Sequence, residues 1–283
     1  MKKFLSLFVI ALVACSATVA AKPKVIAHRG FWDTPGSAQN SLKSLELADS
    51  IGCYGSEFDV WLTADNVLVV NHDDQINGLV IETSQSADIL KQKLPNGETV
   101  PTLDAYLEKA KQTKVKLIFE LKPHKNKAHE TEAVKLSLAM LREKGLMSRT
   151  EFITFSPNAV EQFIKRTFNP VYYLNGDYSI DVLKEKGCAG ADYHYGVFKK
   201  DPGMIKGIQD AGMKVNVWTV NKEADLQHFI DANVDFITTN DPLLAQKLIK
   251  ASCKECPKAC KKGKKSGKKK QYTLFFLKKC ISL

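Results

Sequence analysis

The feature that most constrains the fold is a regular alternation of short β-branched or aromatic runs with longer segments of helical periodicity between residues 24 and 251. This alternation is typical of βα units built on a parallel sheet. Eight segments are expected to be strands: 25–27, 54–61, 115–121, 151–155, 171–174, 191–195, 214–220 and 235–238.

Helices are expected between these strands at 41–50, 103–112, 130–144, 158–167, 180–186, 202–211, 222–232 and 242–250. Four of these helices are followed by a glycine, at Gly52, Gly145, Gly187 and Gly212. Glycine is common just past a helix end because it easily adopts the left-handed conformation that ends a helix. Eight alternating units predict a (β/α)8 TIM barrel, a fold of about 250 residues. An open doubly wound sheet is the alternative, but its phosphate-binding glycine motifs are missing.

The two ends of the chain differ from the predicted barrel at 22–251. Residues 1–21 read as a secretory signal, with two lysines, an apolar run and small residues, so we expect an exported protein, periplasmic or extracellular. Cleavage before Cys15, which would make a membrane-anchored lipoprotein, competes with ordinary cleavage after Ala21. The basic tail at 252–283 is expected to be disordered.

The formal net charge of +10 lies in that tail, which carries eleven Lys and one Glu. The other 251 residues hold 30 basic and 30 acidic side chains, so the barrel offers no basic face for a nucleic acid. The tail, or a lipid on Cys15, is the expected means of peripheral association with a membrane or anionic surface.

Polar residues gather where the expected strands end. The first strand runs into His28-Arg29-Gly30, and the second carries Glu57 and Asp59 two residues apart. Because side chains alternate between the faces of a strand, both carboxylates point the same way. If they point into the barrel they need a counter-charge, which a divalent cation supplies. A solvated edge strand is the other explanation.

Later segments add to this set. His72 follows the short run 67–71, so two histidines near strand ends suggest an acid and a base. Glu120 and Lys122 share one face of the next strand and suit a third metal ligand and a phosphate contact. Trp218 either fills the core or lines the carbon side of a small polyol. Residues 239–242 are expected to close the last strand and cap the last helix.

Together these motifs resemble the glycerophosphodiester phosphodiesterase family over roughly residues 24–250. They occur in the family's order as His28-Arg29-Gly30, Gln39-Asn40-Ser41, Glu57-x-Asp59, His72-Asp73, Pro101-Thr102-Leu103, Glu120-x-Lys122 and Trp218-Thr219-Val220-Asn221. The resemblance implies a TIM barrel with a small insertion at about 74–101. It also implies hydrolysis of glycerophosphodiesters to sn-glycerol 3-phosphate and an alcohol, with Mg or Ca as cofactor.

The resemblance also implies roles for individual residues. Glu57, Asp59 and Glu120 would bind the metal, Arg29 and Lys122 would hold phosphate oxygens, and His28 and His72 would move protons. In the expected mechanism the glycerol 2-hydroxyl attacks phosphorus with His72 as first base, the other histidine protonates the departing alcohol, and water opens the cyclic phosphate.

One position departs from the family pattern, because Gln39 stands where the family usually has Glu. If that Glu supports the metal site or Arg29, the rate or the metal affinity falls here. Gln39 supports one alternative function, a surface binding protein that has lost turnover. A second alternative keeps the same site but cleaves intact phospholipids, as in the related barrel-type phospholipases D.

Overall fold

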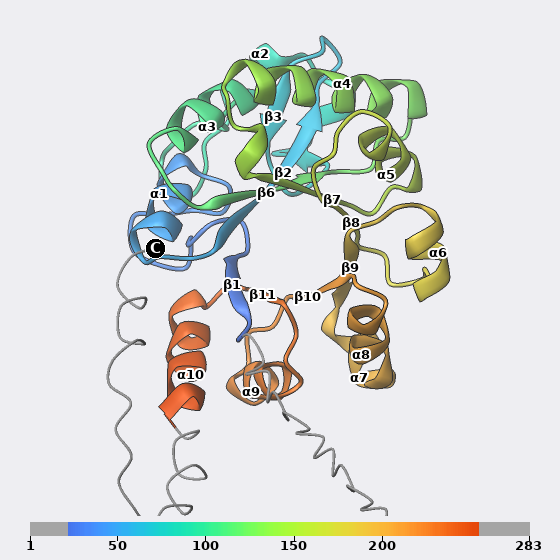
Figure 1. Cartoon of the computed structure of the whole chain (residues 1–283). Coiled ribbons are helices and arrows are strands. Elements are labelled where there is room, and N and C mark those ends of the chain that lie inside the picture. Colours follow the sequence, from blue (N-terminus) through green and yellow to red (C-terminus); the bar gives the residue numbers. More distant parts are fainter. Residues whose placement is uncertain (1–21, 255–283) are drawn as a thin grey trace, which may run out of the picture. The chain divides into compact units, whose positions relative to one another are not determined.

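The computed structural model describes residues 22–254, so the expected signal segment and most of the tail lie outside the described residues. Eight parallel strands form a closed barrel in which β1 pairs with both β11 and β2 (Figure 1). The strands are β1 (Lys24–Ala27), β2 (Gly55–Leu62), β6 (Lys116–Leu121), β7 (Thr150–Thr154), β8 (Val171–Tyr173), β9 (Gly190–His194), β10 (Lys214–Trp218) and β11 (Phe236–Thr239). The predicted TIM barrel is confirmed, and the open sheet is excluded.

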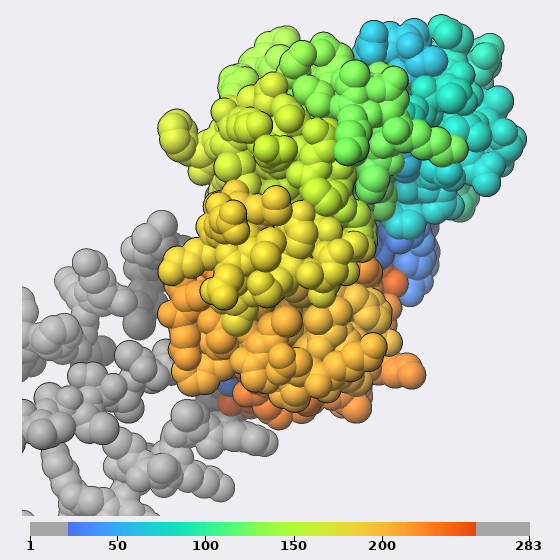
Figure 2. Space-filling view, turned by 90° about the vertical axis from the view of Figure 1, so that its right-hand side faces the viewer, coloured from blue at the N-terminus to red at the C-terminus, as the bar shows by residue number. Residues whose placement is uncertain are grey.

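Helices follow the barrel strands in chain order. They are α1 (Leu42–Ser50), α3 (Leu103–Ala110), α4 (Lys127–Glu143), α5 (Pro157–Ile164), α6 (Ile180–Glu185), α7 (Tyr195–Lys200), α8 (Gly203–Asp210), α9 (Glu223–Asp231) and α10 (Pro242–Lys254), with a 3-10 turn η2 (Met147–Arg149). Figure 2 shows this outer layer from the side of α4 to α8, where the colours run in sequence order and consecutive units lie side by side.

Helix α7, which was not predicted, replaces the end of an expected strand. The backbone N–H of Gly196 donates to His194 Nδ1 at 3.2 Å, so the His194 side chain caps the helix and ends β9. Tyr195 was therefore wrongly expected to lie in a strand. Within the described residues, no helix is long and apolar enough to cross a membrane.

The predicted insertion lies between β2 and α3. It follows β3 (Leu68–Val70), which pairs antiparallel with β2, and contains β4 (Gln75–Ile76), β5 (Leu79–Val80), η1 (Ile81–Thr83) and α2 (Ser86–Ile89). A small apolar cluster of its own holds it against β2, formed by Ala38, Trp61, Val69, Ile81, Ile89, Leu94 and Val100.

Apolar side chains fill two separate layers of the barrel. The larger layer lies between strands and helices, where Phe58 stacks on Tyr106 at 4.4 Å and Phe152 on Phe163 at 4.3 Å between ring centroids. Burying each such ring contributes about 1.5–3 kcal/mol. Inside the barrel the apolar cluster is smaller and includes Ile26, Ile118 and Ile153. The inward positions at the carboxyl ends of β1, β2 and β6 are left to polar residues.

Candidate functional site

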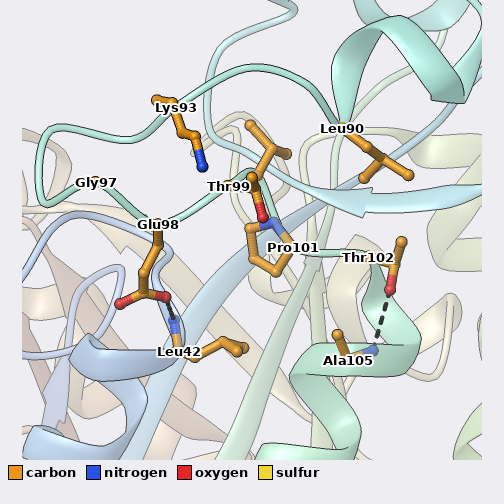
Figure 3. A pocket seen from close by; sticks show the side chains of 10 residues that line it. Leu42, Leu90, Lys93, Gly97, Glu98, Thr99, Pro101, Thr102 and Ala105 are labelled. Carbon is orange, nitrogen blue, oxygen red and sulfur yellow. Dashed lines mark hydrogen bonds between the residues drawn. The ribbon is translucent and has the colours of Figure 1, made fainter.

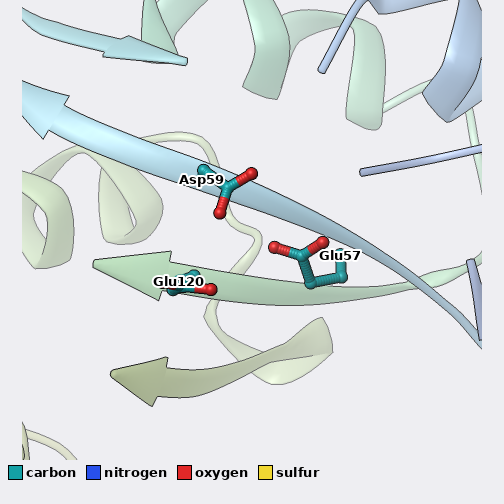
Figure 4. Close-up of side chains that lie close together, drawn as sticks. All are labelled: Glu57, Asp59 and Glu120. Atoms are coloured by element: carbon teal, nitrogen blue, oxygen red, sulfur yellow. The ribbon is translucent and has the colours of Figure 1, made fainter. Parts of the chain in front are cut away.

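Three buried carboxylates meet on β2 and β6. Glu57 and Asp59 lie on β2, and Glu120 lies on the neighbouring strand, where it is the register partner of Asp59. Their candidate ligand oxygens lie within 4.8 Å of one another, and each residue is at most 7% exposed (Figure 4). The inward direction expected from the spacing of two is therefore confirmed, and the edge-strand explanation is excluded.

Lys122 bridges two of the carboxylates, with Nζ at 2.8 Å from both Asp59 Oδ1 and Glu120 Oε1. Burial alone would raise the pKa of Asp59, but the charge of Lys122 outweighs it and the pKa falls. Burial raises the pKa of Glu120 to about 7, and burial followed by the charge of Asp59 raises the pKa of Glu57 well above its usual range. Three ionised carboxylates would carry more negative charge than Lys122 neutralises, so Glu57 and Glu120 tend to hold their protons.

One carboxylate oxygen of Glu57 is available to bind a ligand. Its Oε2 accepts a hydrogen bond from the backbone N–H of Arg29 at 2.7 Å, whereas Oε1 is buried and has no hydrogen-bond partner among residues 22–254. A buried polar atom without a partner costs about 1–3 kcal/mol. Three carboxylates with hard oxygen donors, one of them unsatisfied, fit a divalent cation.

The turn after β1 positions His28 and Arg29. Arg29 and Gly30 both have left-handed φ angles, 56° and 76°, and a β-carbon on Gly30 would lie 2.3 Å from Ser44 Oγ. Only glycine fits this position without moving α1. The tight turn aims the backbone N–H of Arg29 at Glu57 and leaves its guanidinium Nε 3.9 Å from Asp59 Oδ2.

His28 is fixed by a residue from the other end of the barrel sequence. Its Nδ1 lies 2.7 Å from Asn240 Oδ1, and Asn240 is itself held by its backbone N–H, which donates to Asn221 Oδ1 at 2.9 Å. Burial and the charge of Arg29 lower the pKa of His28 to about 4. With the amide oxygen as acceptor, Nδ1 carries the proton and Nε2 is a free base.

Asn240 was missed by the sequence analysis, which expected residues 239–242 only to close a strand and cap a helix. The capping is confirmed, because Asp241 Oδ1 accepts from the backbone N–H of Leu244 at 2.9 Å. Nothing in the sequence marks Asn240 as a partner of His28, since 212 positions separate the two residues.

Gln39 and Asn40 hold two residues of the site, Arg29 and Asp59, in place through hydrogen bonds. Asn40 donates from Nδ2 to Asp59 Oδ2 at 2.8 Å and accepts from the backbone N–H of Asp59 at 3.1 Å. Gln39 Oε1 accepts a hydrogen bond from Arg29 Nη1 at 2.6 Å. Gln39 therefore keeps a contact with Arg29, but as a neutral acceptor rather than a carboxylate.

His72 follows β3, and the segment is tied to β2 because the backbone N–H of Asn71 donates to Asp59 O at 3.0 Å. His72 Nδ1 lies 2.6 Å from Asp73 Oδ1. Because an ionised carboxylate only accepts, Nδ1 carries the proton and Nε2 is left for a ligand. Burial is the largest influence on His72 and lowers its pKa.

Trp218 lies at the end of β10, three strands from β2 in the barrel order. Its indole N–H donates to Asp192 O at 2.8 Å, and its ring meets Phe155 and His194 edge-on at centroid distances of 5.5 and 5.3 Å. The ring packs on the inner apolar cluster and stays partly exposed, so it can also contact a ligand.

A groove of about 840 Å³ opens beside His72, a size within the usual range for small-molecule sites. One wall is the β1–α1 loop, with Trp32 and Gln39, and the other is formed by residues 71–77 and 93–95. No sequence pattern marks this groove, because its two walls consist mostly of irregular segments.

A smaller pocket of about 480 Å³ lies next to the start of α1 and α3 (Figure 3). There Glu98 accepts from the backbone N–H groups of Leu42 at 2.9 Å and Lys43 at 3.3 Å. This carboxylate at a helix N-terminus attaches the insertion to α1. None of the expected site residues lines this pocket, so the groove beside His72 is the better candidate for substrate binding.

Comparison with known proteins gives consistent results. The sequence model of the glycerophosphoryl diester phosphodiesterase family matches residues 28–244. A glycerophosphodiester phosphodiesterase from Caldanaerobacter subterraneus is 26% identical over 254 aligned residues, which cover 81% of this chain and 98% of that protein.

Solved structures agree with this match. The crystal structure of a glycerophosphodiester phosphodiesterase from Parabacteroides distasonis is 46% identical with a TM-score of 0.81, covering 82% of this chain and 98% of that chain. A phosphodiesterase from Oleispira antarctica, in complex with the product sn-glycerol-3-phosphate, is 28% identical with a TM-score of 0.71, covering 81% and 97%.

Proposed function

Because the chain belongs to the glycerophosphoryl diester phosphodiesterase family, we propose that it hydrolyses glycerophosphodiesters to sn-glycerol 3-phosphate and an alcohol. The observation that carries this proposal is the meeting of the three carboxylates with His28 and Lys122 at one end of the barrel. Such a set can hold a cation, bind a phosphodiester and move protons. The product bound to the Oleispira antarctica protein supports this choice of substrate.

Glu57, Asp59 and Glu120 are the proposed ligands of one divalent cation, Mg or Ca. When bound, the cation would stabilise the negative charge that develops on the phosphate oxygens. The buried, unsatisfied Glu57 Oε1 supports this assignment. Because burial raises the pKa of both Glu57 and Glu120, these ligands must lose protons on binding, and metal affinity should increase with pH.

The two histidines are the proposed proton carriers. His28 Nε2 takes the proton of the glycerol 2-hydroxyl, whose oxygen attacks phosphorus as the bond to the alcohol breaks. His72, in the form protonated on both ring nitrogens, gives its Nε2 proton to the departing alcohol oxygen. Water then opens the cyclic phosphate with the roles reversed: His72 takes the proton of water and His28 returns a proton to the 2-oxygen.

The partners of Nδ1 favour this order, which reverses the one expected from the sequence. His28 contacts the neutral amide of Asn240, which gives no charge to stabilise an imidazolium, whereas His72 contacts the carboxylate of Asp73. A carboxylate beside Nδ1 stabilises the protonated ring that a general acid requires.

Arg29 and Lys122 are the proposed phosphate contacts, and Trp218 the contact for the carbon side of glycerol. Arg29 can present a forked pair of donors to phosphate oxygens. Two of the three Lys122 protons face Asp59 and Glu120, so one remains for a phosphate oxygen. Trp218 lies three strands from β2, where an apolar ring can cover the glycerol carbons.

Release of glycerol 3-phosphate from glycerophosphocholine and glycerophosphoethanolamine, measured with Mg, Ca or EDTA, tests the proposal. We expect metal-dependent release that His72→Ala reduces by about 10²–10⁴-fold. His228→Ala, at an exposed histidine on α9, is the matched control. Release that EDTA or His72→Ala leaves unchanged would contradict the assignment of the site. No release from wild type, with release from Gln39→Glu, would mean an impaired site.

The same assay with intact phospholipids addresses the phospholipase D alternative. That activity needs a wide apolar rim, whereas the groove beside His72 is lined mostly by polar residues. Phe168 and Leu243 are the only exposed large apolar side chains in the described part of the chain. We therefore expect water-soluble diesters to be the better substrates.

We also propose that the protein is exported, on the basis of the sequence of residues 1–21. Cell fractionation with N-terminal sequencing of the mature protein tests this. A lipid-modified Cys15 would make it a membrane-anchored lipoprotein, whereas a mature chain starting at Lys22 would leave the tail as the remaining candidate for surface association. Retention of the whole chain in the cytoplasm would refute export.

A further inference from the structure

The groove beside His72 is a candidate subsite that the proposed reaction leaves without a ligand. We propose that it binds the departing alcohol of the substrate, and that it selects alcohols bearing a positively charged ammonium group, such as choline or ethanolamine. This inference rests on the proposed function and adds the class of substrate to it.

The groove is continuous with the residues that surround the reacting phosphate. His72 lines it directly, Gln39 lines it while contacting Arg29 at 2.6 Å, and Asn40 lines it while contacting Asp59 at 2.8 Å. The glycerol half is assigned to the side of Trp218, three strands from β2. A phosphate between these two sides directs its second ester oxygen past His72 and into the groove.

Four of the five neutral amides in the groove form hydrogen bonds with other protein groups. Asn71 Nδ2 donates to Asp73 O at 2.8 Å, and Asn77 Nδ2 donates to Gln92 Oε1 at 2.8 Å. Gln39 Oε1 and both polar atoms of Asn40 are also engaged. Gln75, whose side chain has no hydrogen bond with another described residue, and the remaining N–H and C=O groups of these amides stay available to a ligand. The selection between alcohols must therefore come from charge rather than from hydroxyl contacts.

What the groove offers a ligand is negative charge and an aromatic ring. Asp33 has no hydrogen bond or ion pair with another described residue, and only Oδ1 of Asp73 faces His72. Trp32 lines the same groove, and its buried indole nitrogen has no hydrogen-bond partner within residues 22–254. A tryptophan ring beside carboxylates is the combination that recognises substituted ammonium groups.

Lys93 is the only lysine or arginine in the lining, and it also lines the smaller pocket. Figure 3 shows its ammonium group pointing into that pocket, toward Thr99 and on the side of Glu98. The lining of the groove therefore carries two carboxylates against one lysine, which the groove shares with the smaller pocket. This balance opposes an anionic leaving group and favours a cationic one.

The two walls of the groove are held together before any ligand binds. Besides the contacts of Glu98 with the start of α1, Asn96 Nδ2 donates to Glu98 Oε1 at 2.7 Å and to Gly36 O at 3.5 Å. Residues 93–98 of the insertion are thus tied to the β1–α1 loop that carries Trp32. A preorganised groove discriminates between alcohols with little ordering cost.

Internal competition between equal concentrations of glycerophosphocholine and glycerophosphoinositol tests the inference. Under these conditions the initial ratio of the two alcohols released equals the ratio of the kcat/KM values. Wild type should favour the choline diester. Asp33→Asn should reduce this ratio by about threefold and Trp32→Leu by about fivefold. Asp33→Glu and Trp32→Phe, which keep the charge and the ring, should retain most of it. Glu185→Gln, at an exposed acid on α6, is the control.

The outcomes separate this inference from the proposed function. Release of glycerol 3-phosphate from both diesters without a preference, or with a ratio that Asp33→Asn and Trp32→Leu leave unchanged, would overturn the inference while the hydrolase assignment stands. A preference for the inositol diester would overturn it too. No glycerol 3-phosphate from any diester would instead be the failure of the proposed function. Thermal melting of each variant verifies that it is folded.

Discussion

Two buried glutamates, both 2% exposed, illustrate how the barrel uses carboxylates in opposite ways. Glu130, in the first turn of α4, accepts from His124 N at 3.1 Å, Ser156 Oγ at 2.7 Å and Asn158 Nδ2 at 2.6 Å. Glu57 accepts from Arg29 N alone and keeps Oε1 without a partner among the described residues. Equal burial therefore does not mean an equal role: neutral donors satisfy Glu130, whereas Glu57 lacks a partner that a cation would supply.

Removing the charge of Glu57 should have the largest effect. We expect Glu57→Gln to lose metal binding and to reduce kcat/KM by about 10³-fold, because a bound cation contributes several kcal/mol to charge stabilisation in the transition state. Its stability without metal should not fall, since one of three crowded carboxylates becomes neutral. Isothermal titration with Mg and Ca, together with the diester assay, measures both effects. If Glu57→Gln has nearly wild-type activity, Glu57 is not a ligand of the metal.

Glu130→Ala should show the opposite pattern. The change leaves three donors without their acceptor, and we expect the free energy of unfolding to fall by about 3 kcal/mol, while the folded variant retains most of its activity. Urea unfolding without metal measures the loss. Glu132→Ala, at an acid on the same helix paired with Lys135 at 3.0 Å, should change stability by less than about 1 kcal/mol. If Glu130→Ala is as stable as wild type, Glu130 does not have the stabilising role that distinguishes it from Glu57.

The raised pKa of Glu120 predicts a dependence of stability on pH in EDTA. Because its folded-state pKa is about 7 against the usual 4.5, the folded protein binds more protons than the unfolded chain in this range. Its contribution is therefore greatest below about pH 4.5 and is lost as pH rises toward 7. His28, whose pKa is lowered to about 4, contributes with the opposite sign between about pH 4 and 6.5, so the wild-type curve alone does not isolate Glu120.

The difference in unfolding free energy between wild type and Glu120→Gln removes the contribution of His28. As pH rises from 4.5 to 7, we expect wild type to lose about 2 kcal/mol of unfolding free energy relative to Glu120→Gln. Urea unfolding at several pH values in EDTA measures this loss. Saturating Mg should reverse the loss, because the metal binds the deprotonated carboxylates of wild type. A difference that stays constant with pH would mean that Glu120 titrates normally.

The parts of this molecule that the sequence predicts are those governed by local periodicity. Alternation with a period of two is sufficient to place Glu57 and Asp59 on one inward face, and the eight strand segments are sufficient to predict the barrel. The contact between Asn240 and His28 was not predictable, because it exists only once β11 closes against β1. The groove was not predictable either, since its walls come from two loops without a periodic pattern.

Gln39 is identified by the sequence motif, whereas its contact is known only from the structure. Its neutral Oε1 accepts from Arg29 Nη1 at 2.6 Å, whereas a carboxylate would make the same bond charge-assisted. We expect Gln39→Glu to hold the guanidinium more firmly and to raise kcat/KM by about fivefold, the smallest of the expected effects.

Measuring kcat and KM separately shows how this effect arises. Since Gln39 touches Arg29 and none of the three carboxylates in the described contacts, the change should lower KM for the diester and leave the affinity for Mg unchanged. Gln39→Ala should raise KM, and Gln112→Glu, at an exposed position after α3, should do neither. A higher affinity for Mg in Gln39→Glu would instead mean that the residue at position 39 influences the three carboxylates. The set of residues that supports metal binding with Glu57 would then include the β1–α1 loop.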